Sequence, residues 1–100
     1  MKVEENTMDD ELRQLIEKAA AVLKAAGARE VHIFGSAAQG KLREDSDVDL
    51  AVSGLPPEVF FRAMAQAGDI LGRPLDLIDL DVTTPFTRYL EKEEELQRVG

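Results

Sequence analysis

The chain has 100 residues, 44% of them hydrophobic but only five aromatic, so we expect one domain over residues 1–100 with a core of Leu, Ile, Val and Ala. Its formal net charge of −8 argues against direct nucleic-acid binding, which normally depends on neutralisation of phosphates by Lys and Arg. Cys is absent, which excludes disulfides and thiolate metal sites, and without a long apolar run or a leader-like start we expect a cytoplasmic protein rather than a membrane protein.

Apolar residues at helical spacing predict a first helix between Thr7 and Gly27. A short apolar run predicts a strand over Glu30–Phe34. This strand contains the only histidine, His32, which is a candidate general base. A single histidine on a strand is more often structural, so we favour that interpretation.

A Gly-Ser pair follows this strand, and ten residues later an acidic pair opens the next one. Gly35 allows a sharp turn, and Ser36 can offer its hydroxyl and neighbouring N–H groups to an anion. Asp47 and Asp49 are two residues apart on a strand, so they face the same side with Cα atoms roughly 6–7 Å apart. Such close like charges favour a bound cation, and carboxylates suit Mg²⁺, which also binds phosphates. If the two strands are antiparallel neighbours, the pattern predicts phosphate chemistry.

The segment between the two halves of this motif carries two basic residues. We expect residues 36–40 to form a short helix and the following residues a solvated loop. Lys41 and Arg43 are the basic residues nearest the site in sequence, and either can reach triphosphate oxygens. Alternatively they are surface charges that offset Glu44 and Asp45.

A strand–helix–strand unit follows. Pro57 is suited to the first turn of a helix that ends at Gly72, and the alternating run Leu75–Leu80 predicts a strand. This arrangement implies a right-handed crossover and parallel pairing. Phe60 and Phe61 are adjacent, so one of them cannot lie on the buried stripe of the helix, and the pair suggests a homodimer or a hetero-oligomer.

Parallel pairing would bring a third carboxylate, Asp76, beside Asp47 and Asp49, because parallel strands align their N-terminal ends. Asp76 is then a candidate metal ligand, or the base that takes a proton from an attacking hydroxyl. Two rivals are less suitable. Asp79 faces the opposite side of the strand from Asp76, and Asp81 lies at its far end.

The last segment begins with a helix that Thr84 caps. We expect Phe86, Tyr89 and Leu90 to face inward. Residues 96–99 can be helical or extended, and the sequence does not decide between the two. The whole chain therefore predicts an α/β (α+β) fold, a small mixed sheet of three to four strands with helices mainly on one face.

The motif resembles the signature of the minimal nucleotidyltransferases, small members of the DNA polymerase β superfamily. The resemblance rests on Gly35-Ser36, ten intervening residues, and Asp47-Val48-Asp49 with Ser46 directly before them. It implies the palm-like nucleotidyltransferase fold of that superfamily. It also implies transfer of AMP, or another nucleoside monophosphate, from ATP or another nucleoside triphosphate to a hydroxyl acceptor.

The resemblance also assigns roles to residues. Gly35 and Ser36 would hold the β and γ phosphates, Asp47 and Asp49 would hold Mg²⁺ or Mn²⁺, and Asp76 would complete the metal site and help to deprotonate the acceptor. Relatives often carry Arg just after Gly-Ser, whereas this chain has Ala-Ala-Gln at 37–39. This departure bears on how strongly the triphosphate is held.

Minimal nucleotidyltransferases are commonly encoded beside a helical HEPN-family partner. The resemblance therefore suggests an MntA-like antitoxin that adenylylates a tyrosine of a HEPN toxin. Two alternatives remain open: a non-catalytic antitoxin that blocks its partner by binding alone, and an enzyme that modifies a small molecule such as an aminoglycoside. The sequence leaves the nucleotide base and the acceptor open.

Overall fold

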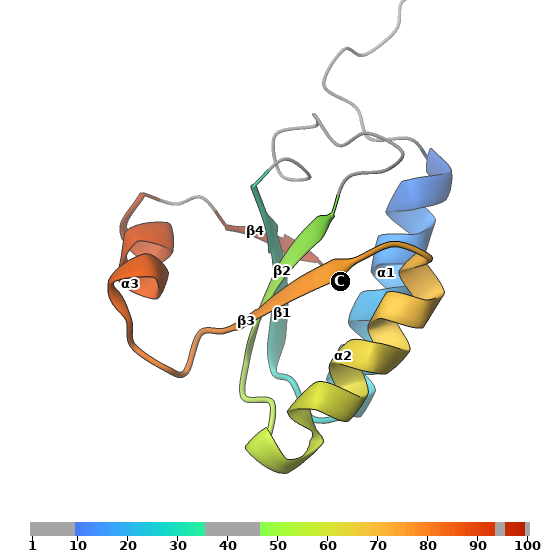
Figure 1. Cartoon of the computed structure of the whole chain (residues 1–100). Coiled ribbons are helices and arrows are strands. Elements are labelled where there is room, and N and C mark those ends of the chain that lie inside the picture. Colours follow the sequence, from blue (N-terminus) through green and yellow to red (C-terminus); the bar gives the residue numbers. More distant parts are fainter. Residues whose placement is uncertain (1–9, 36–46, 94–95, 100) are drawn as a thin grey trace, which may run out of the picture.

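The computed structural model describes residues 10–35, 47–93 and 96–99. These residues form a mixed sheet with helices on both sides of it (Figure 1). The elements in chain order are α1 (Asp10–Ala25), β1 (Glu30–Phe34), β2 (Val48–Ser53), α2 (Pro57–Leu71), β3 (Leu75–Asp79), α3 (Pro85–Lys92) and β4 (Gln97–Val99). The short helix predicted over residues 36–40 lies outside the described residues.

Within the described residues, the sheet has four strands in the order β3-β2-β1-β4. β1 pairs antiparallel with both β2 and β4. β2 and β3 run parallel, because α2 returns the chain to the same end of the sheet. The predicted mixed sheet and the predicted parallel pairing are confirmed, and the last segment, which the sequence left open, is a strand.

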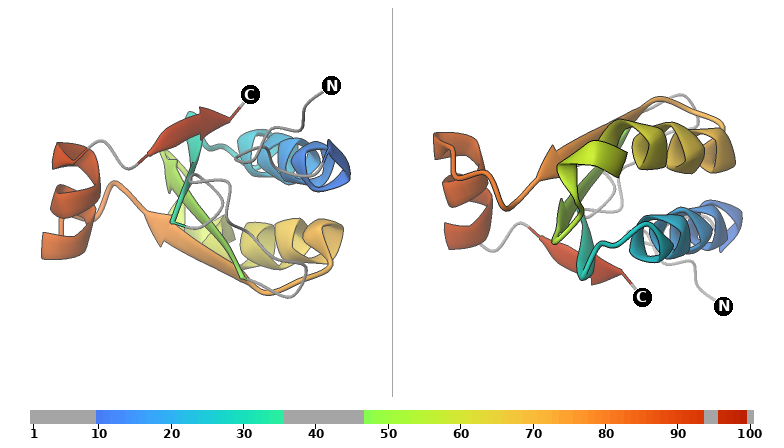
Figure 2. Two further views of the ribbon diagram at one scale, coloured as in Figure 1. Left: turned by 90° about the horizontal axis from the view of Figure 1, so that it is seen from above. Right: turned by 90° about the horizontal axis from the view of Figure 1, so that it is seen from below.

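Helices α1 and α2 lie together on one face of the sheet, and the shorter α3 lies on the other (Figure 2). In α1 the buried residues Leu12, Ile16, Ala19 and Leu23 recur every three or four positions, which places them on one stripe of the helix. Two of the three described helices therefore cover one face, as predicted. None of the described helices combines the length and the hydropathy that a membrane span requires.

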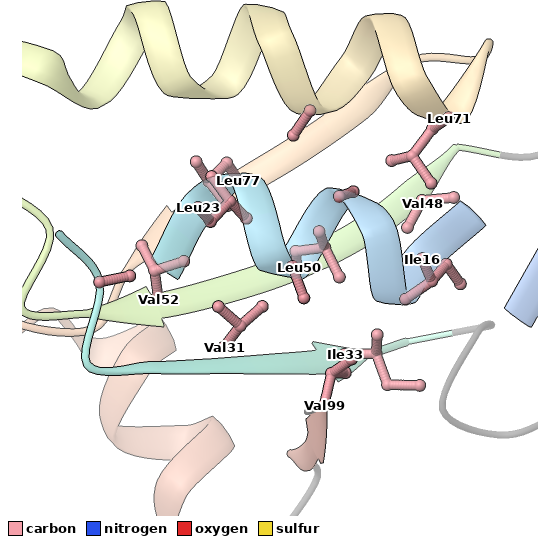
Figure 3. Close-up of a cluster of buried hydrophobic side chains, with 14 of the residues drawn as sticks. Ile16, Leu23, Val31, Ile33, Val48, Leu50, Val52, Leu71, Leu77 and Val99 are labelled. Atoms are coloured by element: carbon pink, nitrogen blue, oxygen red, sulfur yellow. The ribbon is translucent and has the colours of Figure 1, made fainter. Parts of the chain in front are cut away.

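The main core lies between the sheet and the pair α1 and α2 (Figure 3). Every second residue of β1 and β2 enters it, namely Val31, Ile33, Val48, Leu50 and Val52. The residues between them face the other side of the sheet, because neighbouring side chains on a strand point to opposite faces. On that side Phe34 and Ala51 join Leu90 of α3 in a second, smaller apolar cluster. The same two strands thus serve both faces.

The two adjacent rings of α2 differ in burial, as predicted. Phe60 packs against the main core, whereas the side chain of Phe61 is 72% exposed. The rings meet edge to face, with centroids 5.4 Å apart. Together with Pro57 and Asp79 they line a hollow beside the start of α2. The association of this surface with a second chain stays a prediction.

Helix α3 departs in part from the predicted orientation. Thr84 caps it as predicted: its hydroxyl accepts a hydrogen bond from the N–H of Thr87, and the Thr87 hydroxyl accepts one from the N–H of Thr84. Thr87 is therefore drawn inward, and it is buried together with Leu90. Leu90 faces inward as predicted, but the prediction is wrong for Phe86 and Tyr89, which are 47% and 53% exposed. Each of these rings precedes a buried residue and is turned about 100° from it around the helix.

Candidate active site

Gly35 ends β1 in a left-handed turn, with φ of 68°, and lies against the second acidic residue of the motif. A Cβ atom at this position would come within 2.5 Å of Oδ2 of Asp49. Both the backbone angle and the available space therefore require glycine. The structure brings Gly35 and Asp49 together, as the antiparallel arrangement predicts.

The strand registers bring the three predicted carboxylates to one end of the sheet, where β1 ends and where β2 and β3 begin. Asp49 is paired with Phe34, the last residue of β1, and on its other side with Asp76 of β3. Asp47 is exposed and directly precedes β2. Because Val48 points into the main core, Asp49 turns to the opposite face, which α3 covers in part. The parallel pairing thus places Asp76 where the sequence predicts it.

Asp49 is partly buried, and its pKa is raised above the ordinary value for aspartate. Burial is the largest cause, because it disfavours the charged carboxylate. The negative charges of Asp76 and Asp47 raise the pKa further. The ionised cluster is therefore electrostatically unfavourable, and a cation bound among these groups would relieve it.

The donor atoms at this end of the sheet suit a hard divalent cation. Asp47, Asp49 and Asp76 offer only carboxylate oxygens, the ligands that Mg²⁺ and Mn²⁺ prefer. Within residues 10–35, 47–93 and 96–99, however, no three acidic or histidine side chains already surround a common point that could hold a metal. Carboxylates repel one another, so nothing favours their convergence without a cation. Because the strand registers already hold the backbones together, we expect side-chain rotation to complete the ligand set.

Binding of a divalent cation should therefore stabilise the protein. We expect millimolar Mg²⁺ or Mn²⁺ to raise the melting temperature by a few degrees, about the effect of 1 kcal/mol on a domain of this size. The Asp47→Asn/Asp49→Asn double variant should show no such rise. The measurement is a thermal melt with and without metal, and equal shifts in the two proteins would mean that this cluster does not bind the metal.

The remaining candidates from the sequence are not part of this cluster. Ser36, Lys41 and Arg43 lie outside the described residues. Asp79 is paired with Val52 at the far end of β2. There Asp79 Oδ1 accepts a hydrogen bond from the N–H of Asp81 (2.9 Å).

Asp81 has a structural role at that same far end. Its Oδ2 accepts a hydrogen bond from the N–H of Gly54 (2.7 Å), and its Oδ1 lies 4.0 Å from the guanidinium of Arg29. These contacts fix the turn after β2. The structure therefore separates Asp79 and Asp81 from the acidic cluster, as their sequence positions predict.

His32 lies on the same face of the sheet as Asp49. It is in register with Ala51, two residues after Asp49, and with Arg98 of β4. Its Nε2 is 3.6 Å from Oε1 of Glu30. Burial lowers the pKa of His32 most; the charge of Glu30 raises it and that of Arg98 lowers it. Nδ1 is buried and has no hydrogen-bond partner among the described residues. These contacts fit the structural interpretation.

Two aromatic residues that the sequence does not single out as part of the site lie on the same face of the sheet as Asp49. Phe34, in register with Asp49, is only 6% exposed. Its ring meets that of Phe86 from α3 in an edge-to-face contact, with centroids 5.9 Å apart and an interplanar angle of 65°. Strand alternation places Phe34 on this face, but no pattern in the sequence indicates that α3 brings Phe86 to it.

A family model described as Polymerase beta, Nucleotidyltransferase matches residues 11–96. The chain belongs to the polymerase β nucleotidyltransferase family. The match includes all three strands of the candidate site, β1, β2 and β3, and the helices around them. The similarity of this polymerase β nucleotidyltransferase to its family is therefore not limited to the Gly-Ser and Asp-x-Asp motif but includes the elements around it. No curated protein is similar enough to count as a match.

Solved structures with similar folds agree with this assignment. A protein described as a minimal nucleotidyltransferase is 28% identical, with a TM-score of 0.66 over 89% of this chain and 94% of that chain. A toxin–antitoxin structure with AMP-PNP is 21% identical (TM-score 0.66, covering 86% of this chain and 70% of that chain). The toxin–antitoxin MntA-HepT is 20% identical (TM-score 0.60, covering 85% and 69%). This polymerase β nucleotidyltransferase thus has the fold of the minimal nucleotidyltransferases nearly throughout.

Proposed function

We propose that this chain is an antitoxin that transfers AMP from ATP to a tyrosine hydroxyl of a HEPN-family toxin. One observation carries the enzymatic part: Asp49 lies between Gly35 and Asp76, with Asp47 two residues before it, at a single end of the sheet. Clustered carboxylates beside a glycine turn suit a metal-assisted reaction at a phosphate. The family assignment supports nucleotidyl transfer as that reaction.

The reaction forms one bond and breaks one. The acceptor oxygen attacks the α-phosphorus of ATP, the bond from that phosphorus to the bridging oxygen breaks, and pyrophosphate leaves with the electron pair. Bound Mg²⁺ would supply positive charge that neutralises the phosphates. Asp47 and Asp49 would hold this ion, and Asp76 would complete its ligand set and help to accept the proton of the acceptor hydroxyl. Gly35, whose turn closely approaches Asp49, would help to hold the β and γ phosphates.

Two observations support a protein acceptor. Similar folds occur in toxin–antitoxin structures, one of them with AMP-PNP, an ATP analogue. The chain also carries a net charge of −8, which suits docking on a basic partner surface such as the active-site face of an RNase. A tyrosine hydroxyl on that partner would be the acceptor.

The test is transfer of label from α-³²P-ATP, with Mg²⁺, to a purified HEPN-family toxin that binds this chain. Label from the α-phosphate should appear on the toxin, and label from γ-³²P-ATP should leave in pyrophosphate. Replacement of the acceptor tyrosine by phenylalanine should remove the signal. If the γ-label and not the α-label stays on the toxin, the enzyme is a kinase, and the proposal is wrong.

A non-catalytic antitoxin is the second candidate. It is favoured by the described carboxylates, which do not converge on one point, and by the Ala-Ala-Gln sequence where relatives often have Arg. The Asp47→Asn/Asp49→Asn variant separates the two functions. If the chain is an enzyme, this variant should bind the toxin but fail to neutralise it. Full neutralisation by the variant would favour the binder, and turnover of an aminoglycoside without any partner protein would favour a small-molecule enzyme.

A further inference from the structure

The sheet face that carries the carboxylates continues into an apolar surface. Asp76, Asp49 and Phe34 form one row across β3, β2 and β1, since each is in register with the next. Beside this row Phe34 joins Ala51 and Leu90 in the second apolar cluster. A ligand held at the carboxylates therefore has an aromatic neighbour one strand away, about 5 Å across the sheet.

Phe34 itself is covered, but its partner is not. The ring of Phe34 is 6% exposed, whereas Phe86, which packs edge-on against it, remains 47% exposed. The contact with Phe34 holds the Phe86 ring in place while part of the ring stays accessible to solvent. Phe86 is therefore a fixed aromatic surface close to the carboxylate row, on the face that Asp49 also occupies.

We propose that Phe86 supports the base of the bound nucleoside triphosphate by stacking; this inference rests on the proposed function. The base is joined to the α-phosphate through one ribose, so it must lie within a short distance of the carboxylates. The acceptor hydroxyl must also reach the α-phosphorus, so the experiment has to distinguish the base from the acceptor as the partner of the ring. Phe34 is in register with Asp49, and the ring of Phe86 lies one contact further, 5.9 Å from that of Phe34 between centroids. Stacking on an aromatic ring tolerates any base, because every base has a π-face.

The experiment compares ATP with inorganic tripolyphosphate, which has the phosphates but no base. Both are titrated calorimetrically, with Mg²⁺, into the full chain and into its Phe86→Ala and Phe86→Trp variants. Phe86→Ala should weaken ATP binding about 5- to 100-fold and leave tripolyphosphate binding unchanged, and Phe86→Trp should retain ATP binding. The matched control is Phe61→Ala, which removes an exposed ring on the helix α2, on the opposite face of the sheet.

The other outcomes distinguish failure of the inference from failure of the proposed function. Equal ATP affinity in wild type and Phe86→Ala would refute the inference and leave the proposed function intact. The inference would also be wrong if Phe86→Ala kept ATP affinity but lost transfer to the toxin, because the ring would then contact the acceptor. Equal weakening of ATP and tripolyphosphate would indicate a general structural effect and count against stacking. Failure of the wild type to bind either compound would refute the proposed function itself.

Discussion

Replacement of Asp49 by Asn should reduce nucleotidyl transfer by at least ~100-fold and, at the same time, raise the melting temperature of the metal-free protein by a few degrees. Activity falls because the amide supplies neither the negative charge nor the second oxygen that would hold the metal ion, and this ion would neutralise and position the phosphates. Stability rises because burial and the charges of Asp76 and Asp47 disfavour an ionised Asp49. The substitution therefore moves activity and stability in opposite directions.

The stability gain should depend on pH in a defined direction. The pKa of Asp49 is higher in the folded than in the unfolded chain, so its ionised form costs stability fully above the folded-state pKa. The cost disappears as the pH falls through that pKa toward the ordinary value of 3.8. The melting temperatures of wild type and variant, measured in EDTA, should therefore differ most near neutral pH and converge in acid.

Asp69→Asn is the matched control for this experiment. Asp69 is exposed on α2, so its replacement changes the net charge by the same amount without touching the acidic cluster. It should leave both transfer and melting temperature close to wild type. If Asp49→Asn stabilised the protein no more than Asp69→Asn at pH 7, the like-charge interpretation of the cluster would be incorrect.

Replacement of Gly35 by Ala should have the second large effect. The left-handed φ of 68° alone costs about 1–2 kcal/mol with a side chain, and the new Cβ would also press on Oδ2 of Asp49. For a domain of this size we expect the melting temperature to fall by ~5–15 °C. Transfer should fall with it, because Asp49 has to move away. Chemical or thermal denaturation and the label-transfer assay measure the two effects.

Gly72 provides a control with the same backbone angle. Its φ is 69°, but a Cβ there would meet nothing within 4 Å. Gly72→Ala should therefore show the backbone cost alone and retain activity. The difference between the two variants isolates the contact with Asp49. If both lost the same stability and Gly35→Ala retained full transfer, close approach of the turn to the acidic residue would have no functional role.

Much of the fold follows from local patterns in the sequence. The alternation in β1 and β2 decides which residues enter the core, and the strand–helix–strand order decides that β3 runs parallel to β2. That crossover was sufficient to place Asp76 beside Asp49 from sequence alone. The placement succeeded because register and direction depend on periodicity and connection length, both of which a sequence shows.

Other features depend on contacts between distant segments, and the sequence does not show these. The inward orientation predicted for Phe86 and Tyr89 was wrong because the hydrogen bonds of Thr87 set the rotation of α3. Gly35 approaches Asp49 only because β1 and β2 pack closely at their ends. The raised pKa of Asp49 also depends on this packing, through burial of its carboxyl group. The contact of Phe86 with Phe34 joins residues 52 positions apart.

Alternate residues of β2 have different roles. Val48, Leu50 and Val52 face the helices α1 and α2, whereas Asp49 faces the other side of the sheet. The apolar residues of α1 and α2 are separated from the carboxylates by the thickness of the sheet. A lineage can therefore exchange them, and an engineer can redesign that layer, without altering the chemistry. A one-residue deletion within β2 is different, because it would turn both sets to the wrong faces at once. We therefore expect the composition of the helical layer to tolerate change more readily than the length of this strand.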